Sequence, residues 1–575
     1  MPLRSWITRF LFQQIPWKNW VQSFVLLGLF IFSGGCGSPP GIEIVADTNR
    51  DGKVEFEQDR PGKDRWTPER GALFFNNNDS DLDSHIPDHA DDVINGPNDL
   101  KDLAMLCVKR ISGLTEETKI VISVDNTSWS HVRLFLQSRD DGYVSLLHPG
   151  DGRIDPSFLK EQDLELRIEA NSYADSSWSG ETKVTLTVTP PNGDPQTDSV
   201  LLKVAPFILL SNLNTGKTLY VREFPGRNDT FLQSLKQLVP EVGADLKIVP
   251  AREPYSPNQI WLQDTMEIGY SEIPGHRMNV VLKANRGKSL DEFARNGLLG
   301  PDFGWIEIGG LRKTYGSGRG GNGWLDWYGN LEVTPPVPGY PLGRIFYGYN
   351  PEGPDEASLN PAIVDMFSAQ GVQTPLIRID TGWLLIKHVD EVFSFLPTGN
   401  PEDPFKVLVA DTSAMISLLE KWMREGYGDQ RVFEPYEKEE VTVGILYNDK
   451  NLMELNRKLQ KDRIEPNIDL LKSELGLQEE DFIRIPSLID EYGMAIVPNM
   501  VNSTILNGHI YIIAPKGPKI EGKDQLEEEM RHLISGLPLT PYFLEAGMYH
   551  VWGGEVHCAT NVRREGPEIP WWLNK

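Results

Sequence analysis

The spacing of apolar residues changes near residue 205, and this change divides the chain into two kinds of fold. The first part holds short alternating runs at Lys119–Val124, His131–Leu136, Leu164–Ile168 and Val184–Val188. Alternation with frequent turn residues predicts half-buried strands and favours a β-sandwich. In the second part, helical patterns such as Thr412–Glu425 alternate with strand-like runs such as Ile510–Ala514, which predicts an α/β domain. We therefore expect an α+β protein with a sandwich over residues 42–205 and an α/β domain over residues 206–575.

The first 36 residues are typical of an export signal. Basic residues precede Val21–Phe32, an apolar run of twelve residues, which is shorter than the roughly 20 residues of a transmembrane helix. Small residues then lead to Cys36, and this ending resembles a bacterial lipobox, although Ser33 stands where the usual Leu would be. We predict a lipid-anchored protein, exported to the periplasmic or cell-surface side, with residues 37–41 as a tether. A plain cleaved signal and an uncleaved anchor remain alternatives, and both also export the protein.

Composition excludes two broad classes of protein. Lys plus Arg is 56 and Asp plus Glu is 82, so the net charge is −26. A chain this acidic is a poor partner for nucleic acid, whose binding needs a basic face. Hydrophobic residues make up 39% of the chain, which excludes global disorder. Only three cysteines occur, Cys36, Cys107 and Cys558, so no disulfide framework is expected, although a Cys107–Cys558 pair remains open.

An acidic stretch over residues 76–102 indicates a metal site. Its many carboxylates repel one another, and calcium, which takes 6–8 oxygen ligands, would relieve that repulsion. A shorter run from Asp47 to Gly52 has the first half of an EF-hand loop, but its twelfth position is Gln58 instead of Glu, so the full motif fails. We predict metal binding within residues 47–102, with a solvated acidic loop as the alternative.

Four residues of the second domain suit acid–base or nucleophilic chemistry. Cys558 is its only cysteine and is either a buried thiol or a nucleophile. His388 and Asp390 would share one face if they lie on a strand, which suits proton transfer. Asp264 is the fourth candidate. Taken singly, each has an ordinary structural explanation, and spacing does not show that they meet.

The strings that surround these residues are more specific. In chain order they are Trp261-Leu-Gln-Asp-Thr-Met-Glu-Ile-Gly-Tyr270, Gly300-Pro-Asp-Phe-Gly304, Gly329-Asn-Leu-Glu-Val333, Tyr340-Pro-Leu-Gly-Arg-Ile345, His388-Val-Asp-Glu391, Pro498-Asn-Met-Val-Asn502 and Gly554-Glu-Val-His-Cys-Ala-Thr-Asn-Val-Arg-Arg564. Together they resemble the catalytic domain of the protein-arginine deiminases (peptidylarginine deiminases). The resemblance extends through residues 42–205 to that family's immunoglobulin-like middle domain. The first domain of the animal enzymes has no counterpart.

This resemblance implies an immunoglobulin-like sandwich followed by a five-bladed α/β propeller, the pentein fold. It implies hydrolysis of arginine side chains in proteins or peptides to citrulline and ammonia, through a covalent thiouronium on the cysteine. The residues that would be catalytic are Asp264, His388, Asp390 and Cys558, and those that would bind substrate are Trp261 and Arg286. Trp552 replaces an Arg that lines the substrate entrance of the animal enzymes, which puts the peptide preference in doubt.

The resemblance also implies several calcium ions. One site would use the side chains of Gln263, Glu267 and Glu332 and the carbonyls of Tyr328 and Leu331. The middle-domain sites would use Asn77, Asp79, Asp81, Asp88, Asp91, Asp99, Asp102 and, from the catalytic domain, Asp302. Val93 replaces one further carboxylate of these sites. A second site beside the active centre fits poorly, because Thr265 replaces a family Glu and Lys283 stands near an expected Asp, so we expect that calcium to be absent or replaced by the Lys ammonium.

Three other functions compete with this prediction. A pentein enzyme could act on free arginine or another small guanidine, but Arg286 and the sandwich argue against it. A calcium-stabilised surface binding protein with a dead catalytic site would not need the four catalytic residues. A Cys/His thiol protease would not need paired carboxylates. Membrane contact is expected only through Cys36.

Overall fold

The computed structural model describes residues 41–82, 85–139, 142–146, 152–312, 321–354, 357–434 and 441–574. The predicted export signal, Cys36 and residues 37–40 of the tether lie outside these ranges. Within them, no helix is both long enough and apolar enough to cross a bilayer.

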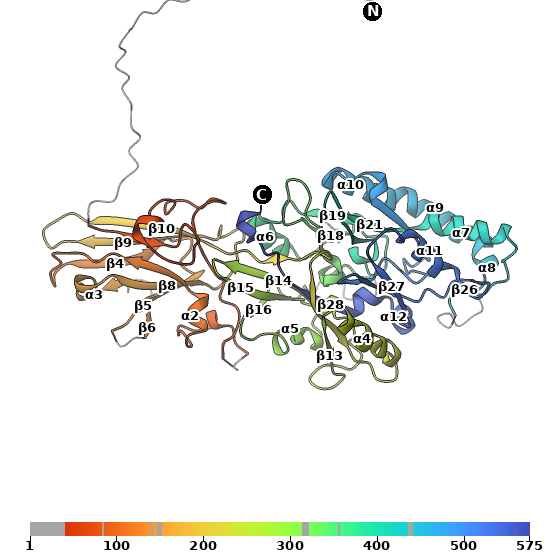
Figure 1. Ribbon diagram of the computed structural model, residues 1–575, viewed down its shortest axis with the longest axis horizontal. Helices are drawn as coiled ribbons and strands as arrows, with labels where there is room; N and C mark the ends of the chain where they lie inside the picture. Colours follow the sequence, from red (N-terminus) through yellow and green to blue (C-terminus); the bar gives the residue numbers. More distant parts are fainter. Residues whose placement is uncertain are drawn as a thin grey trace, which may run out of the picture.

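The first part of the chain forms two five-stranded sheets that enclose one core. In spatial order, one sheet holds β1 (Ile44–Ala46), β3 (Ala104–Val108), β8 (Leu164–Ala170), β5 (Val132–Gln137) and β6 (Tyr143–Ser145). The other holds β2 (Ala72–Phe74), β10 (Gln196–Val204), β9 (Glu181–Thr189), β4 (Lys119–Val124) and β7 (Arg153–Ile154). Both sheets bury alternate side chains in the same cluster, Leu134 and Leu166 from one and Leu186 and Val200 from the other. The predicted sandwich and its four strand runs are therefore confirmed, and it forms one end of the elongated molecule (Figure 1).

The rest of the described chain repeats one sheet pattern five times. The sheets are β28–β12–β13 (Thr560–Arg564, Gly216–Arg222, Asp245–Val249), β14–β15–β16 (Met266–Ile273, His276–Lys283, Phe303–Glu307), β17–β18–β19 (Leu331–Val333, Ile345–Tyr349, Ile377–Asp380), β20–β21–β22 (Phe393–Asn400, Asp403–Asp411, Phe482–Pro486) and β23–β24–β27 (Thr504–Leu506, His509–Ile513, Thr540–Leu544). In each, the first two strands are antiparallel and the last two are parallel. The short β11 (Ile208–Leu209) extends the second sheet, and β25 (Lys519–Ile520) pairs with β26 (Lys523–Asp524).

Helices lie between the two parallel strands of each unit, because a parallel pair needs a crossover. They are α4 (Asp229–Glu241), α5 (Phe293–Asn296), α6 (Pro361–Gln370), α7 (Thr412–Arg424), α8 (Val443–Asn448), α9 (Lys450–Leu459), α10 (Glu465–Leu475) and α11 (Gln525–Leu533). The unit with four of them forms the end of the molecule opposite the sandwich (Figure 1). The predicted α/β pattern is confirmed. The first sheet pairs β28, near the end of the chain, with β12, near the start of the second domain, so it joins the two ends of the repeat.

A tight turn precedes the first strand of each unit. These turns are η2 (Gln263–Thr265), η5 (Tyr328–Asn330), η6 (Val389–Glu391), the residues around Asn502, and α13 (Val556–Ala559). Contacts join η2 to η5, η5 to η6, and α13 to η2. The same topological position in five units therefore brings Asp264, Gly329, Asp390, Asn502 and Cys558 together, although they are up to 294 residues apart in the sequence.

Candidate active site

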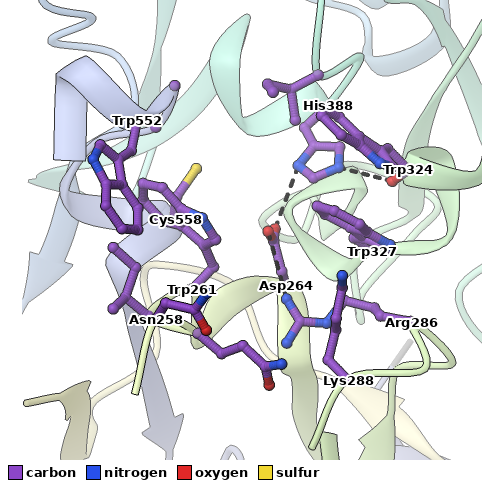
Figure 2. Close-up of a pocket in the computed structure, with 15 residues that line it drawn as sticks. Asn258, Trp261, Asp264, Arg286, Lys288, Trp324, Trp327, His388, Trp552 and Cys558 are labelled. Atoms are coloured by element: carbon purple, nitrogen blue, oxygen red, sulfur yellow. Dashed lines mark hydrogen bonds and ion pairs between the residues drawn. The ribbon is translucent and has the colours of Figure 1, made fainter. Parts of the chain in front are cut away.

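A pocket of about 280 Å³ opens where these turns meet. Five of the six residues predicted for catalysis and substrate binding line it, namely Trp261, Asp264, Arg286, His388 and Cys558. Figure 2 shows Cys558 and His388 on opposite sides of this pocket, with Asp264 between them. The sixth, Asp390, is not among the lining side chains and lies beside Cys558, on the side of His557.

Cys558 lies in α13 and is 5% exposed. Its amide donates to Asn502 Oδ1 over 3.1 Å, and Asn502 Nδ2 lies 3.2 Å from Sγ. Burial, with the negative charges of Asp390, Asp264 and Glu391, raises the pKa of the thiol well above its usual value. Both cysteines of the described chain, Cys107 and Cys558, are free, so the pairing that the sequence left open is wrong.

Asp390 connects the thiol to a second histidine. Its Oδ2 lies 3.5 Å from Cys558 Sγ and accepts from His557 Nδ1 over 2.9 Å. Its Oδ1 is buried and has no hydrogen-bond partner in the described chain. The prediction that His388 and Asp390 share a strand face is wrong. Val389–Glu391 forms a 3-10 turn, which directs His388 to the pocket and Asp390 beneath Cys558.

His388 and Asp264 face each other across a gap. His388 is fully buried, and its Nε2 lies 2.8 Å from the carbonyl of Trp324. Since a carbonyl only accepts, Nε2 carries a proton and Nδ1 faces Asp264 Oδ1 at 3.5 Å (Figure 2). Burial raises the pKa of Asp264, opposed by His388 and Arg286. A Cβ on Gly329 would lie 2.5 Å from His388 Nδ1 and 3.1 Å from both Asp264 Oδ1 and Asp390 Oδ2, so glycine leaves open the space where these groups converge.

Aromatic and basic side chains form the rest of the pocket. Trp261 lies on the Cys558 side, next to the half-exposed Trp552, and Trp324 stacks on Trp327 on the His388 side (Figure 2). Arg286 is held by Asp291 at 2.7 Å and by Thr265 Oγ1 at 2.7 Å, and lies 3.8 Å from Asp264. The guanidinium of Arg286 is therefore fixed at the floor of the pocket instead of projecting freely into it.

The first predicted calcium site lies directly behind the pocket. Gln263, Glu267 and Glu332 line a cavity of about 30 Å³ together with Asn561 and Arg564. Glu332 Oε1 is buried without a hydrogen-bond partner among the described residues. Burial and the charge of Glu332 raise the pKa of Glu267 well above its usual value, and burial raises that of Glu332 to about 7. Arg564 in the same cavity offsets part of this negative charge, the pKa values stay raised in spite of it, and the oxygen set fits calcium.

The backbone carbonyls predicted as ligands for this site belong to the η5 turn and to the first residue of β17. Tyr328 directly precedes Gly329 and Leu331 follows it by two residues, and the Tyr328 carbonyl accepts from Gln263 Nε2 over 3.2 Å. Calcium bound here would therefore touch the turn that carries Gly329.

The position next to the active centre, where we expected no calcium, holds a lysine and a threonine in place of two carboxylates. Lys283 Nζ lies 2.6 Å from Glu292 and 3.2 Å from Glu307. Thr265 Oγ1 accepts from Arg286 and donates to the carbonyl of Trp261. Lys283 therefore already neutralises two carboxylates there, and the replacement of calcium by its ammonium stays a prediction.

The structure gathers most of the predicted middle-domain ligands beside the second domain. Asn77, Asp79, Asp88, Asp99 and Asp102 are buried and Asp81 is partly buried. Asp302 reaches the cluster from the second domain, with its amide donating to Asp79 Oδ2 over 2.8 Å. Burial raises the pKa of Asp79 to about 9 and that of Asp88 to about 7. Asp91 instead faces solvent and accepts from the amide of Val93.

Sequence reasoning missed three residues of these sites. Asn502 holds Cys558, and His557 joins Asp390 to Glu332, whose Oε1 is 3.5 Å from Nε2. Glu169 is buried in β8 and accepts from Asn77 Nδ2 over 2.8 Å. Asn502 and His557 both lie within the family strings. Glu169 instead lies in β8 at a position where the alternation predicts a solvent-facing side chain, so no sequence pattern indicated that it is buried.

Comparison with known proteins agrees with this geometry. The family described as protein-arginine deiminase matches residues 194–573, and the family described as its middle domain matches residues 41–189. The chain is 32% identical over 564 residues to mouse protein-arginine deiminase type-1, and 33% identical over 563 residues to the human type-4 protein. Each of these alignments covers 92% of this chain and 82% of the relative.

Among solved structures, an agmatine deiminase from C. jejuni matches at 10% identity with a TM-score of 0.38, covering 63% of this chain and 96% of that one. An agmatine deiminase of Enterococcus faecalis matches with a TM-score of 0.34, covering 62% and 96%. Similarity this distant adds no argument about function. The family matches and the two close relatives confirm the predicted resemblance and the predicted enzyme class, and the chain belongs to the protein-arginine deiminase family.

Proposed function

We propose that this protein hydrolyses the guanidinium group of arginine side chains in proteins or peptides, producing citrulline and ammonia. One observation carries the proposal: Asp264, Asp390, His388 and Cys558 surround the open space at Gly329. A guanidinium is a planar cation with five donors in a fixed fork, and it suits a space between two carboxylates. A neutral amide would leave these charges unpaired, which argues against a protease.

Two carboxylates would hold the guanidinium over the thiol. Asp264 Oδ1 and Asp390 Oδ1 are both buried without hydrogen-bond partners within the described chain, so each has a free acceptor for an N–H donor. Charge-assisted bonds of this kind are short and directional. They would fix the central carbon near Cys558 Sγ, while Trp261 would cover the methylene groups of the substrate.

The bound cation would also activate the nucleophile. Before substrate binds, burial and nearby carboxylates favour the protonated thiol. A guanidinium placed between Asp264 and Asp390 offsets that negative charge and favours the thiolate. The thiol proton passes to His388, and the thiolate attacks the guanidinium carbon to form a tetrahedral adduct.

His388 then serves as acid and base in turn. Its Nδ1 donates the proton to the departing nitrogen, so ammonia leaves and a thiouronium remains on Cys558. Neutral His388 removes a proton from water, and the resulting hydroxide attacks the same carbon. Collapse of this second adduct expels the thiolate, which takes the proton back from His388, and the hydroxyl proton of the adduct passes to solvent as citrulline leaves. The carbonyl of Trp324, which holds Nε2 at 2.8 Å, keeps Nδ1 directed at the reacting atoms.

We further propose that the enzyme depends on calcium. Gln263, Glu267 and Glu332, with the carbonyls of Tyr328 and Leu331, would hold one ion, and the acidic cluster of the sandwich would hold others. Calcium would neutralise two partly buried glutamates next to the turns that carry Asp264 and Gly329, and so stabilise the arrangement of the pocket. This is a structural effect, since none of these oxygens reaches the pocket interior.

The repeated sheets also support finer proposals about the fold. Five units with the same strand pattern, closed by β28 against β12, favour the five-bladed propeller, and the two-sheet part favours an immunoglobulin-like domain. We propose in addition that the exported protein is attached to a membrane through lipid on Cys36. Mass spectrometry of the mature N-terminus tests the anchor.

An assay with three substrates tests the activity. Ureido formation is measured on a blocked arginine ester, an arginine-containing peptide and free arginine, with and without calcium. The proposal predicts calcium-dependent turnover of the ester and the peptide. Turnover of free arginine alone would instead indicate a small-guanidine enzyme, no turnover would indicate a binding protein, and cleavage of the peptide chain would indicate a protease.

A further inference from the structure

A tryptophan stands at the mouth of the pocket, where the main chain of a substrate would pass. Of the described residues that line the pocket, three are exposed, namely Asn258, Lys288 and Trp552. Trp552 is the apolar member of these three and is 46% exposed. Cys558, on the same side of the pocket, is only 5% exposed (Figure 2). The indole therefore lies at the rim, and the thiol lies at depth.

The fold holds this indole in place. Trp552 is the last residue of α12 (Gly547–Trp552), and Gly553 ends that helix with a φ of 95°, a left-handed conformation that favours glycine. Tyr549, in the same helix, is fully buried and anchors it. The Trp552 ring also packs edge-on against Phe224, with ring centroids 5.4 Å apart and an angle of 63° between the planes. The exposed part of the indole is thus a fixed apolar surface.

A substrate arginine would bring its neighbours to this surface. An arginine side chain that reaches Cys558 leaves its own backbone at the rim, and the adjacent Cα atoms are only 3.8 Å away along the chain. Contact with an apolar side chain would remove exposed surface of Trp552 from water, which is favourable. Phe224 is partly buried beside the indole and extends the apolar surface, whereas the charge of Lys288 disfavours a second basic residue at the rim.

We propose that Trp552 selects substrates in which an aromatic or large aliphatic residue adjoins the arginine. The neighbouring side chain packs on the exposed part of the indole while the arginine side chain occupies the pocket. This inference rests on the proposed deimination, because it concerns the same pocket. It makes Trp552 a specificity-determining residue that takes no part in the bond-making steps.

A peptide series tests the selection. Each peptide contains one arginine, and Phe, Ala or Lys is placed next to it, first on the amino side and then on the carboxyl side. The ratio of kcat/KM for the Phe and Ala peptides is measured for each protein with calcium present. Trp552→Ala removes the ring, and Trp552→Phe keeps an aromatic surface. Val551→Ala is the matched control, because Val551 is 58% exposed in the same helix but is not among the residues that line the pocket.

We expect the wild-type protein to favour Phe over Ala by at least about fivefold on one side of the arginine, a factor in the range that aromatic pairs contribute. The ratio should fall to about one in Trp552→Ala and should persist in Trp552→Phe and Val551→Ala. Because the ratio compares two substrates of one protein, a general loss of activity cancels.

Other results would overturn the inference. These are equal kcat/KM for the Phe and Ala peptides of the wild-type protein, an unchanged ratio in Trp552→Ala, or an equal loss of the ratio in Val551→Ala. Preference for the Lys peptide would show that the indole binds a cation instead. If the wild-type protein converted none of the peptides, the proposed function itself would fail, and this inference would fail with it.

Discussion

Replacing Asp390 by Asn should change the reactivity of Cys558 and the deimination rate in opposite directions. Asp390 Oδ2 lies 3.5 Å from Cys558 Sγ, and its charge raises the pKa of that thiol. With an effective dielectric constant of about 20, a thiolate and a carboxylate at that separation repel by roughly 5 kcal/mol. The dipole of the asparagine amide and relaxation of the site would preserve much of this repulsion. We therefore expect the substitution to stabilise the thiolate by about 1.4–3 kcal/mol, which corresponds to ten- to hundredfold more thiolate near neutral pH.

Deimination should fall in the same variant. The amide cannot provide the charge-assisted bond to the guanidinium, which is worth about 1.5–3 kcal/mol. We therefore expect kcat/KM to decrease at least about tenfold. Loss of structure would also expose the buried thiol and lower turnover, so the variant must in addition keep the urea midpoint of the wild-type protein.

The assay is alkylation by iodoacetamide, followed by mass spectrometry of each cysteine peptide at several pH values. Cys107 provides an internal control, because it lies in the sandwich, where burial raises its pKa to about 11. Its alkylation should be the same in both proteins. If Cys558 of the Asp390→Asn protein were alkylated no faster than in the wild-type protein while Cys107 stayed constant, the electrostatic reasoning would be refuted.

Three other predictions follow from the same contacts. Gly329→Ala should reduce kcat at least about a hundredfold with an unchanged circular dichroism spectrum, because its Cβ would lie 2.5 Å from His388 Nδ1 and disturb the reacting geometry; near wild-type kcat would show that the space is not used. In excess chelator, the urea midpoint of unfolding should fall as the pH rises from 6 to 9. Burial raises the pKa of Asp79 to about 9 in the folded protein, so its protonation contributes stability that is fully present below the unfolded pKa and is lost as the pH rises through the folded pKa. A midpoint that does not change with pH would contradict this. Thr265→Glu with Lys283→Asp should steepen the calcium activation curve, whereas the wild-type Hill coefficient should be near one; identical curves would show that Lys283 does not replace an ion.

Local pattern predicted the elements of this fold better than their arrangement. The run Lys119–Val124 is a strand with the predicted limits, and Thr412–Glu425 differs from α7 by one residue. Alternation and helical period depend on near neighbours, which the sequence displays directly. The pairing of β28 with β12 joins residues more than 300 positions apart, and nothing in either strand specifies its partner.

The active site could likewise be predicted in its residues but not in their arrangement. Asp264, His388 and Cys558 are candidates by residue type, and only the family strings connect them, because their meeting depends on five turns that no periodicity marks. The geometry of His388-Val389-Asp390 was misjudged because three residues fit a strand or a 3-10 turn equally well, and packing against the neighbouring turns decides between them. The ion pair between His276 and Asp102 was missed for a related reason: it forms only where the hairpin tip meets the sandwich.

The most direct test of the central claim compares the wild-type protein with Cys558→Ser on a peptide that contains a single arginine, with calcium present. Mass spectrometry of the peptide and an ammonia assay follow the reaction together. The account predicts equal amounts of citrulline and ammonia from the wild-type protein, and less than about a hundredth of that rate from the variant, because a serine hydroxyl lacks thiolate nucleophilicity. Citrulline formation by the variant above that level, or none by the wild-type protein, would contradict it.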